Sequence, residues 1–219
     1  MQTGGCRTKI CCIGTEKELA IAARLGANLI GLVGPMPSGP GTITLAAAAR
    51  VARTCPQQVT SVLLSAAHSA EDLIAEIRLV QPGAIQIVRQ LAPEVHDLLA
   101  TEVPTIQRIQ VIHVDGTRAV EQISTYGDKP DAFLLDSGRP KDDELGGTGR
   151  VHDWAISRAC VEAAARPVFL AGGLHSENVG DAIRQVRPHG IDVCSGVRTN
   201  GNLDDAKLST FMAAIRGAE

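Results

Sequence analysis

The feature that most constrains this chain is a regular alternation between short β-branched runs and segments with the apolar spacing of helices, repeating about every 25 to 30 residues. We expect eight strands, near Lys9–Ile13, Asn28–Val33, Val59–Leu64, Ala84–Val88, Ile109–Val114, Ala132–Leu135, Pro167–Leu170 and Ile191–Cys194. We expect eight helices after them, near Glu16–Leu25, Leu45–Thr54, Ala70–Val80, Pro93–Ala100, Thr117–Thr125, Asp153–Ala164, Ser176–Val186 and Asp204–Arg216. Ser69 and Ser176 are the expected helix caps.

Eight strand–helix units in 219 residues predict an α/β fold, a single-domain (β/α)8 TIM barrel over residues 1–219, with a short N-terminal extension at 1–7. A doubly wound open sheet is the alternative, but the sequence has neither G-x-G-x-x-G nor G-x-x-x-x-G-K-[ST]. Aromatic residues make up only 2% of the chain, so Val, Ile, Leu and Ala must build the core, as suits buried parallel strands.

Charge and composition exclude several classes of function. The 21 Lys and Arg residues against 24 acids give a net charge of −3, which disfavours a nucleic-acid partner. Prolines and glycines interrupt the longest uncharged run, so we expect no membrane span, and without an apolar leader we expect a cytoplasmic protein. The six cysteines lack CxxC or Cys/His spacing, so neither a zinc site nor a disulfide framework is indicated, and we expect no metal and no cofactor.

In such a barrel the active site lies where the strands end, and the first strand ends in K-I-C-C-I. Because strand side chains alternate, one of Cys11 and Cys12 points into the barrel. A thiol there is a candidate base or nucleophile if Lys9 favours the thiolate, and a small buried hydrophobe otherwise.

The sixth strand ends in F-L-L-D-S, which places Asp136 at the same rim as a candidate acid or a turn cap. The following Gly146–Gly149 allows close backbone approach to a substrate, or is only a flexible turn. Among the histidines, His113 is best placed to line the pocket, although a hydrogen-bonded core histidine is the preferred interpretation of its position.

Glycine turns follow the last two strands, with Gly172 and Gly173 in one and Ser195 and Gly196 in the other. Helix starts nearby make these turns a predicted phosphate site, against plain turn geometry as the alternative. Arg198, just beyond, points at an anion or is solvated.

Together these segments resemble phosphoribosylanthranilate isomerase of tryptophan biosynthesis from Lys9 to about Phe211. The matching segments are K-I-C at Lys9–Cys11, L-L-D at Leu134–Asp136, G-G-T-G at Gly146–Gly149 with Asp153 and Trp154, A-G-G-L with Asn178 and Val179, and D-V-C-S-G-V at Asp192–Val197.

The resemblance implies an isomerase that performs an Amadori rearrangement of an N-(5-phosphoribosyl)-amine. It implies Cys11 as general base, Asp136 as general acid, and Gly172, Gly173, Ser195 and Gly196 as the phosphate site. The partner is then a small sugar phosphate, and the protein a monomer or homodimer. Further substrate-binding candidates are Lys9, Gln86, Arg89, Gly147, Asp192 and Arg198.

The sequence also departs from the family. The stretch 37–42 lacks the arginine that holds the anthranilate carboxylate, the Q-L-H-G motif reads Gln86-Ile87-Val88-Arg89, Cys12 replaces a glycine, and Arg198 replaces a glutamate. Arg89 or Arg198 has then taken over the carboxylate, or the substrate is a different phosphoribosylamine. The same scaffold could also form a non-catalytic sugar-phosphate-binding barrel, but keeping both Cys11 and Asp136 favours an enzyme. An aldolase or epimerase is a third alternative, which no strand-end lysine positioned for a Schiff base and no metal cluster supports.

Overall fold

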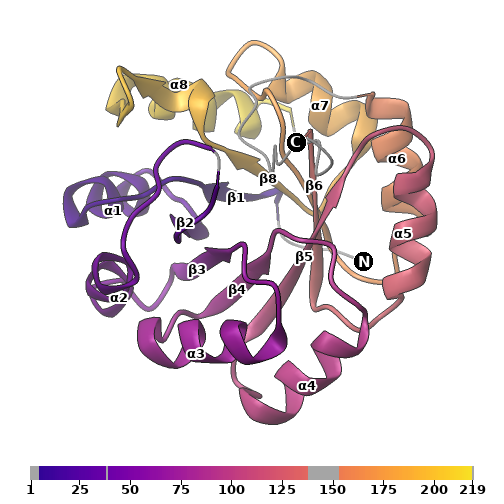
Figure 1. Ribbon diagram of the computed structural model, residues 1–219. Helices are drawn as coiled ribbons and strands as arrows, with labels where there is room; N and C mark the ends of the chain where they lie inside the picture. Colours follow the sequence, from indigo (N-terminus) through magenta and orange to yellow (C-terminus); the bar gives the residue numbers. More distant parts are fainter. Residues whose placement is uncertain (1–4, 38, 138–152, 219) are drawn as a thin grey trace.

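The computed structural model describes residues 5–37, 39–137 and 153–218, and its centre is a closed barrel of eight parallel strands in the order β1 to β8 (Figure 1). The strands are β1 Arg7–Ile10, β2 Leu29–Val33, β3 Thr60–Ser65, β4 Ala84–Ile87, β5 Gln107–His113, β6 Ala132–Asp136, β7 Val168–Leu170 and β8 Gly190–Val193. The barrel closes where Lys9 of β1 pairs in register with Asp192 of β8. The predicted (β/α)8 TIM barrel is confirmed.

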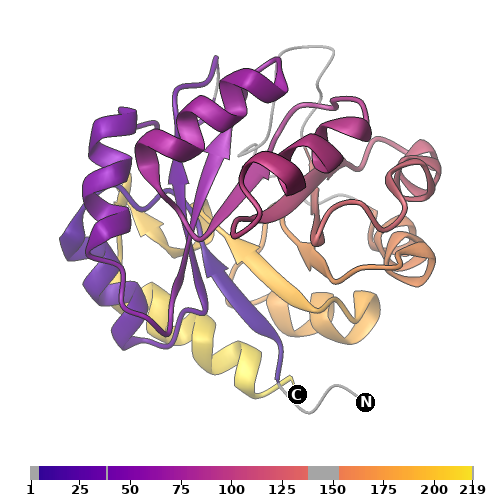
Figure 2. The ribbon, with the colours of Figure 1, turned by 90° about the horizontal axis from the view of Figure 1, so that it is seen from below.

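One helix follows each strand, and the helices surround the barrel (Figures 1 and 2). They are α1 Glu16–Arg24, α2 Leu45–Arg53, α3 Ala70–Val80, α4 Glu94–Glu102, α5 Arg118–Tyr126, α6 Trp154–Ala163, α7 Val179–Val186 and α8 Asp205–Arg216.

Alternating side chains of each strand divide the apolar core into two layers. In β2, Leu29 and Val33 pack inside the barrel, whereas Ile30 and Leu32 pack between barrel and helices. Both layers are mainly aliphatic, as the low aromatic content predicts. The same alternation indicates whether a polar side chain at a strand end points into the barrel or toward the helices.

Of the two expected helix caps, Ser69 is confirmed and Ser176 is wrong. The Ser69 hydroxyl accepts a hydrogen bond from the Asp72 N–H at 3.1 Å, as predicted for the start of α3. The expected start of α7 at Ser176 is wrong, because the helix begins at Val179. The Asn178 side chain instead accepts from the His175 N–H at 2.8 Å, which holds the preceding residues in a turn.

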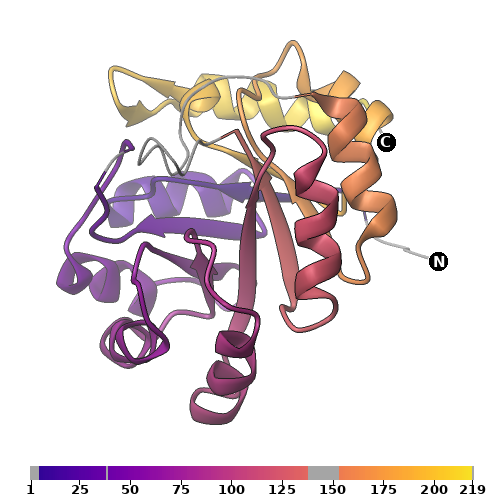
Figure 3. The ribbon, with the colours of Figure 1, turned by 45° about the vertical axis from the view of Figure 1, so that its right-hand side comes forward.

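The first strand ends earlier than expected, at Ile10, so Cys11 and Cys12 lie just beyond it. It also begins earlier, so Arg7 belongs to the barrel rather than to an extension. A short hairpin, β9 Arg198–Thr199 and β10 Asn202–Leu203, follows the 3-10 turn Ser195–Val197 and was not predicted. It lies beside the start of α8 (Figure 3).

The search for membrane-spanning helices and for metal-binding groups covers the described part of the chain. There, no helix combines the length and apolar composition needed to cross a bilayer. Over the same residues, no three His, Cys, Asp or Glu side chains are grouped so as to hold a metal ion.

Candidate active site

Cys11 lies directly after β1, and its side chain belongs to the apolar cluster inside the barrel. It is 6% exposed. On the neighbouring strand β2 its sulfur faces Gly31, where a Cβ atom would lie 2.9 Å from it. A side chain at position 31 would displace the thiol, so the glycine keeps Cys11 directed into the barrel.

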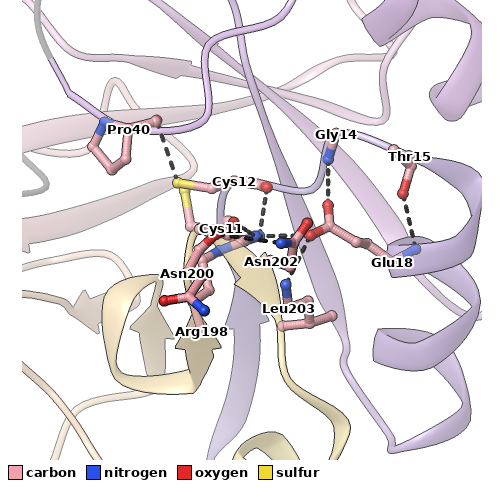
Figure 4. Close-up of polar contacts among 11 residues, drawn as sticks. Cys11, Cys12, Gly14, Thr15, Glu18, Pro40, Arg198, Asn200, Asn202 and Leu203 are labelled. Carbon is pink, nitrogen blue, oxygen red and sulfur yellow. Dashed lines mark hydrogen bonds and ion pairs between the residues drawn. The ribbon is translucent and has the colours of Figure 1, made fainter.

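Cys12 belongs to the same apolar cluster as Cys11, but its sulfur has different hydrogen-bond partners. Its sulfur donates a hydrogen bond to the carbonyl of Pro40 at 3.6 Å, toward the loop after β2 (Figure 4). Its contacts with Cys11 and Cys194, together with burial, raise the pKa of the Cys12 thiol. Cys12 is therefore held as a neutral thiol, which makes it unsuitable as a base.

A buried ion pair between Lys9 and Asp192 lies near these thiols. The Lys9 ammonium is fully buried, 3.1 Å from the Asp192 carboxylate. Burial alone would lower the pKa of Lys9, but Asp192 and the nearby Cys11 raise it overall. Lys9 is therefore a permanent cation beside the Cys11 sulfur, where it favours negative charge on that atom.

Asp136 ends β6 and points into the barrel, because its neighbours Leu134 and Leu135 face inward and outward respectively. Its carboxylate accepts a hydrogen bond from the Ser137 N–H at 2.7 Å. Burial raises the pKa of Asp192, and the charge of Asp136 raises it further. Asp136, Asp192 and Lys9 therefore form an electrostatically connected group inside the barrel that extends to Cys11.

The two glycine turns lie against each other at the same end of the barrel. Gly172 and Gly173 both have positive φ, at 86° and 63°, which favours glycine. A Cβ atom on Gly196 would lie 2.0 Å from the carbonyl oxygen of Leu174. Among the described residues, the backbone N–H groups of Gly172, Gly173, Ser195 and Gly196 donate no hydrogen bond to a protein acceptor. Such N–H groups can bind phosphate oxygens without a basic side chain.

Asn178 was not predicted to take part in this region. Besides its bond to His175, its side-chain amide donates to the Gly173 carbonyl at 3.0 Å. Asn178 therefore holds the first glycine turn in shape. An asparagine a few residues after G-G and before a helical run is the signal that could have indicated this.

Two of the predicted substrate-binding residues, Gln86 and Arg89, lie on β4 and just after it. Gln86 points into the barrel, 4% exposed, and its side-chain oxygen is buried without a hydrogen-bond partner in the described residues. Arg89 is half-buried at the end of β4, where its Nε donates to the Ala66 carbonyl at 2.8 Å. Its two terminal nitrogens donate to no acceptor within the described ranges.

Arg198 is engaged within the protein. Its terminal nitrogens donate to Glu18 at 2.8 Å, to the Gly201 carbonyl at 2.9 Å, and to the carbonyls of Cys11 and Cys12 (Figure 4). With those nitrogens occupied, Arg89 becomes the better candidate for a substrate anion. Gly147, the remaining candidate, lies outside the described residues.

Known proteins are similar to this chain in sequence and in fold. A family model described as N-(5'phosphoribosyl)anthranilate (PRA) isomerase matches residues 8–214. N-(5'-phosphoribosyl)anthranilate isomerase 2 of Methanosarcina mazei is 35% identical over 208 residues, 94% of this chain and 92% of the relative. N-(5'-phosphoribosyl)anthranilate isomerase of Methanothrix thermoacetophila is 34% identical over 213 residues, covering 97% of this chain and 99% of the relative.

Solved structures agree. Phosphoribosyl anthranilate isomerase from Thermotoga maritima matches with a TM-score of 0.83 at 28% identity, over 97% of this chain and 99% of that chain. A phosphoribosyl anthranilate isomerase in complex with reduced 1-(o-carboxyphenylamino)-1-deoxyribulose 5-phosphate matches with a TM-score of 0.81 at 26% identity, over 97% and 99% of the two chains. Because the family model extends from β1 into α8, this chain belongs to the N-(5'-phosphoribosyl)anthranilate isomerase family.

Proposed function

We propose that this protein converts N-(5'-phosphoribosyl)anthranilate into its aminodeoxyribulose isomer in tryptophan biosynthesis. The observation that carries the proposal is that Cys11 and Asp136 both lie at the carboxyl ends of strands and face the barrel interior. Family membership supplies the substrate class. No step of the reaction needs a metal or a redox cofactor, because an Amadori rearrangement only moves protons and electron pairs within the substrate.

In the proposed mechanism Asp136 is the general acid and Cys11 is the general base. The Asp136 carboxyl gives its proton to the ring oxygen of the sugar, the C1–O bond breaks, and the ring opens to an iminium ion. The Cys11 thiolate then removes the C2 proton, and the C2–H electrons form the enamine, which tautomerises to the ketone. The Lys9 cation beside Cys11 favours the thiolate that this step requires.

We assign the substrate phosphate to the turns at Gly172–Gly173 and Ser195–Gly196. Their N–H groups, which donate to no acceptor in the described residues, and the positive φ of Gly172 and Gly173 support this assignment. The relative solved with a reduced deoxyribulose 5-phosphate compound binds a phosphate-bearing ligand of the same kind.

We assign the anthranilate carboxylate to Arg89. The 37–42 stretch contains no arginine, and Arg198 is engaged with Glu18 and backbone carbonyls. The Nε of Arg89 donates to Ala66, and no described residue engages its two terminal nitrogens, which leaves them for an anion. A guanidinium with two available nitrogens can bind a carboxylate in bidentate geometry.

The assembly we propose is a monomer or homodimer in the cytoplasm. A relative from Thermotoga maritima is described as a dimeric enzyme from which monomers were generated, which supports either state. Cys11, Cys12, Cys55, Cys160 and Cys194 are free thiols, as is usual for proteins of a reducing compartment.

Growth complementation of a host that lacks the tryptophan-pathway isomerase tests the function directly. We expect the wild-type gene to restore growth without tryptophan, and Cys11→Ser and Asp136→Asn to fail although both variants fold. Failure of the folded wild-type protein to support growth or to convert the purified substrate would contradict the proposal. Intact binding of ribose 5-phosphate in that case would favour an altered amine or a non-catalytic barrel.

A further inference from the structure

Arg198 touches the backbone on both sides of one residue. One of its terminal nitrogens donates to the Cys11 carbonyl at 3.1 Å and also to the Cys12 carbonyl (Figure 4). These two oxygens belong to the peptide groups before and after Cys12. One guanidinium nitrogen therefore restricts both backbone torsions of Cys12.

Those torsions are unfavourable for a cysteine. The φ of Cys12 is 64°, in the left-handed region that residues with a Cβ atom rarely adopt. The side chain of Cys12 offsets little of that cost, because a thiol is a weak hydrogen-bonding group in its contacts with Pro40, Cys11 and Cys194. Charge-assisted hydrogen bonds from Arg198 are the strongest contacts available to hold this conformation.

Arg198 is itself held in place by Glu18 of α1. The two side chains are 9% and 15% exposed and lie 2.8 Å apart. Glu18 also accepts hydrogen bonds from the N–H groups of Gly14 and Leu203, each at 2.9 Å. The carboxylate thus joins the loop after β1, the hairpin and the guanidinium into one buried polar network.

The position of the Cys11 sulfur depends on this backbone. Cys11 precedes the left-handed residue, and its sulfur fits against Gly31 with no room for a Cβ atom there. Rotation of the peptide between Cys11 and Cys12 would move the thiol relative to the barrel interior. Misplacement of a reacting group by about 1 Å can cost on the order of 100-fold in rate.

We propose that Arg198, anchored by Glu18, is a positioning residue that holds the strained Cys11–Cys12 backbone so that the Cys11 thiol faces the substrate. This inference rests on the proposed role of Cys11 as the base. Arg198 does not touch the substrate in this arrangement. It acts through the carbonyls of Cys11 and Cys12. We expect its contribution to kcat to be large only when residue 12 is not glycine.

The test is a double-mutant cycle between Arg198→Met and Cys12→Gly, measured as kcat and KM for N-(5'-phosphoribosyl)anthranilate. In the wild-type background we expect Arg198→Met to lower kcat by roughly 10- to 100-fold with KM changed less than about threefold. With Cys12→Gly present, the same change should cost much less, because glycine adopts positive φ without strain. Equal losses of kcat in both backgrounds would overturn the inference.

Arg24→Met is the matched control, because Arg24 of α1 forms an exposed ion pair with Asp205 of α8 away from the Cys11 carbonyl. We expect it to leave kcat unchanged. Should Arg198→Met fail to fold, Glu18→Gln replaces it in the same cycle.

Thiol chemistry supplies a second readout. Mass spectrometry of iodoacetamide-treated protein should show the rate of alkylation at Cys11 changing in Arg198→Met and returning toward wild type with Cys12→Gly. An unchanged Cys11 rate and unchanged kcat in Arg198→Met would refute the positioning role. Full activity in Cys11→Ser would instead remove the proposed base, which is a separate failure.

Discussion

The ammonium of Lys9 and the carboxylate of Asp192 form an ion pair of 3.1 Å inside the barrel, with exposed fractions of 0% and 8%. The pair joins β1 to β8 in register, where the sheet closes. Lys9 of this pair places a positive charge near Cys11. The charge of Asp136 raises the pKa of the other member, Asp192. One contact thus connects closure of the fold with the two groups assigned to catalysis.

Asp192→Asn should destabilise the protein strongly, because it leaves the buried Lys9 cation without a counter-charge. We expect the free energy of unfolding in urea to fall by about 3–5 kcal/mol. Glu102→Gln is the control, since its partner Arg78 is 60% exposed, and it should cost at most about 1 kcal/mol. Equal losses in the two variants would show that burial of the Lys9 pair has no special cost.

Gly196→Ala should impair phosphate binding, because the added Cβ would lie 2.0 Å from the Leu174 carbonyl oxygen and push the two glycine turns apart. We expect the affinity for ribose 5-phosphate, measured by calorimetry, to fall about tenfold or more. Gly217→Ala, whose Cβ would meet nothing closer than 3.6 Å, should bind normally. Unchanged affinity in Gly196→Ala would place the phosphate elsewhere.

The barrel could be predicted because its sequence signal, a short β-branched run followed by a helical pattern, is local and occurs eight times. A few β-branched residues are enough to indicate each strand. The hairpin was missed although Asn200-Gly201 is a common two-residue turn, and both residues have positive φ. Its strands have two residues each, too short for any periodicity to indicate them.

The role of Arg198 could not be predicted, because its partner Glu18 is 180 positions away in the sequence. Thr15 and Glu18 do have capping-box spacing, and Thr15 caps α1 as that pattern predicts. The pattern gives the start of the helix but not the partner that Glu18 finds beside it, after β8, where the barrel closes. Only the closed fold brings the two charges together.

Glu18→Gln should reduce thermal stability at neutral pH more than at acid pH. Burial alone would raise the pKa of Glu18, but the N–H groups of Gly14 and Leu203 and the Arg198 guanidinium lower it overall. A carboxylate whose pKa is lowered by folding stabilises the protein above its unfolded pKa of about 4.3, and this stabilisation is lost as the pH falls through the folded pKa.

The difference in melting temperature between wild type and Glu18→Gln should therefore be largest near neutral pH and shrink below about pH 4. Glu16→Gln on the same helix is the control, because the contact of Glu16 with Arg50 is long, at 3.9 Å, and exposed. A difference between wild type and Glu18→Gln that stays constant with pH would contradict the assigned network.

Arg89→Ala should weaken recognition of the anthranilate carboxylate. Loss of a hydrogen-bonded charge partner costs about 1.5–3 kcal/mol, so we expect KM for N-(5'-phosphoribosyl)anthranilate to rise roughly 10- to 100-fold with a smaller change in kcat. Arg89→Lys keeps the charge but not the bidentate geometry and should fall between. Arg184→Ala, in an exposed pair with Asp181, is the control and should behave as wild type.

The aniline analogue of the substrate, which lacks the carboxylate, separates recognition from general damage. Its kcat/KM should be equal in wild type and Arg89→Ala, because the only substrate contact that we assign to Arg89 is one that the analogue cannot make. A similar loss with both compounds would show that Arg89 supports the loop and does not bind the carboxylate. A wild-type kcat/KM with the anthranilate compound far below about 10⁴ M⁻¹s⁻¹ would instead indicate that the natural substrate carries another amine.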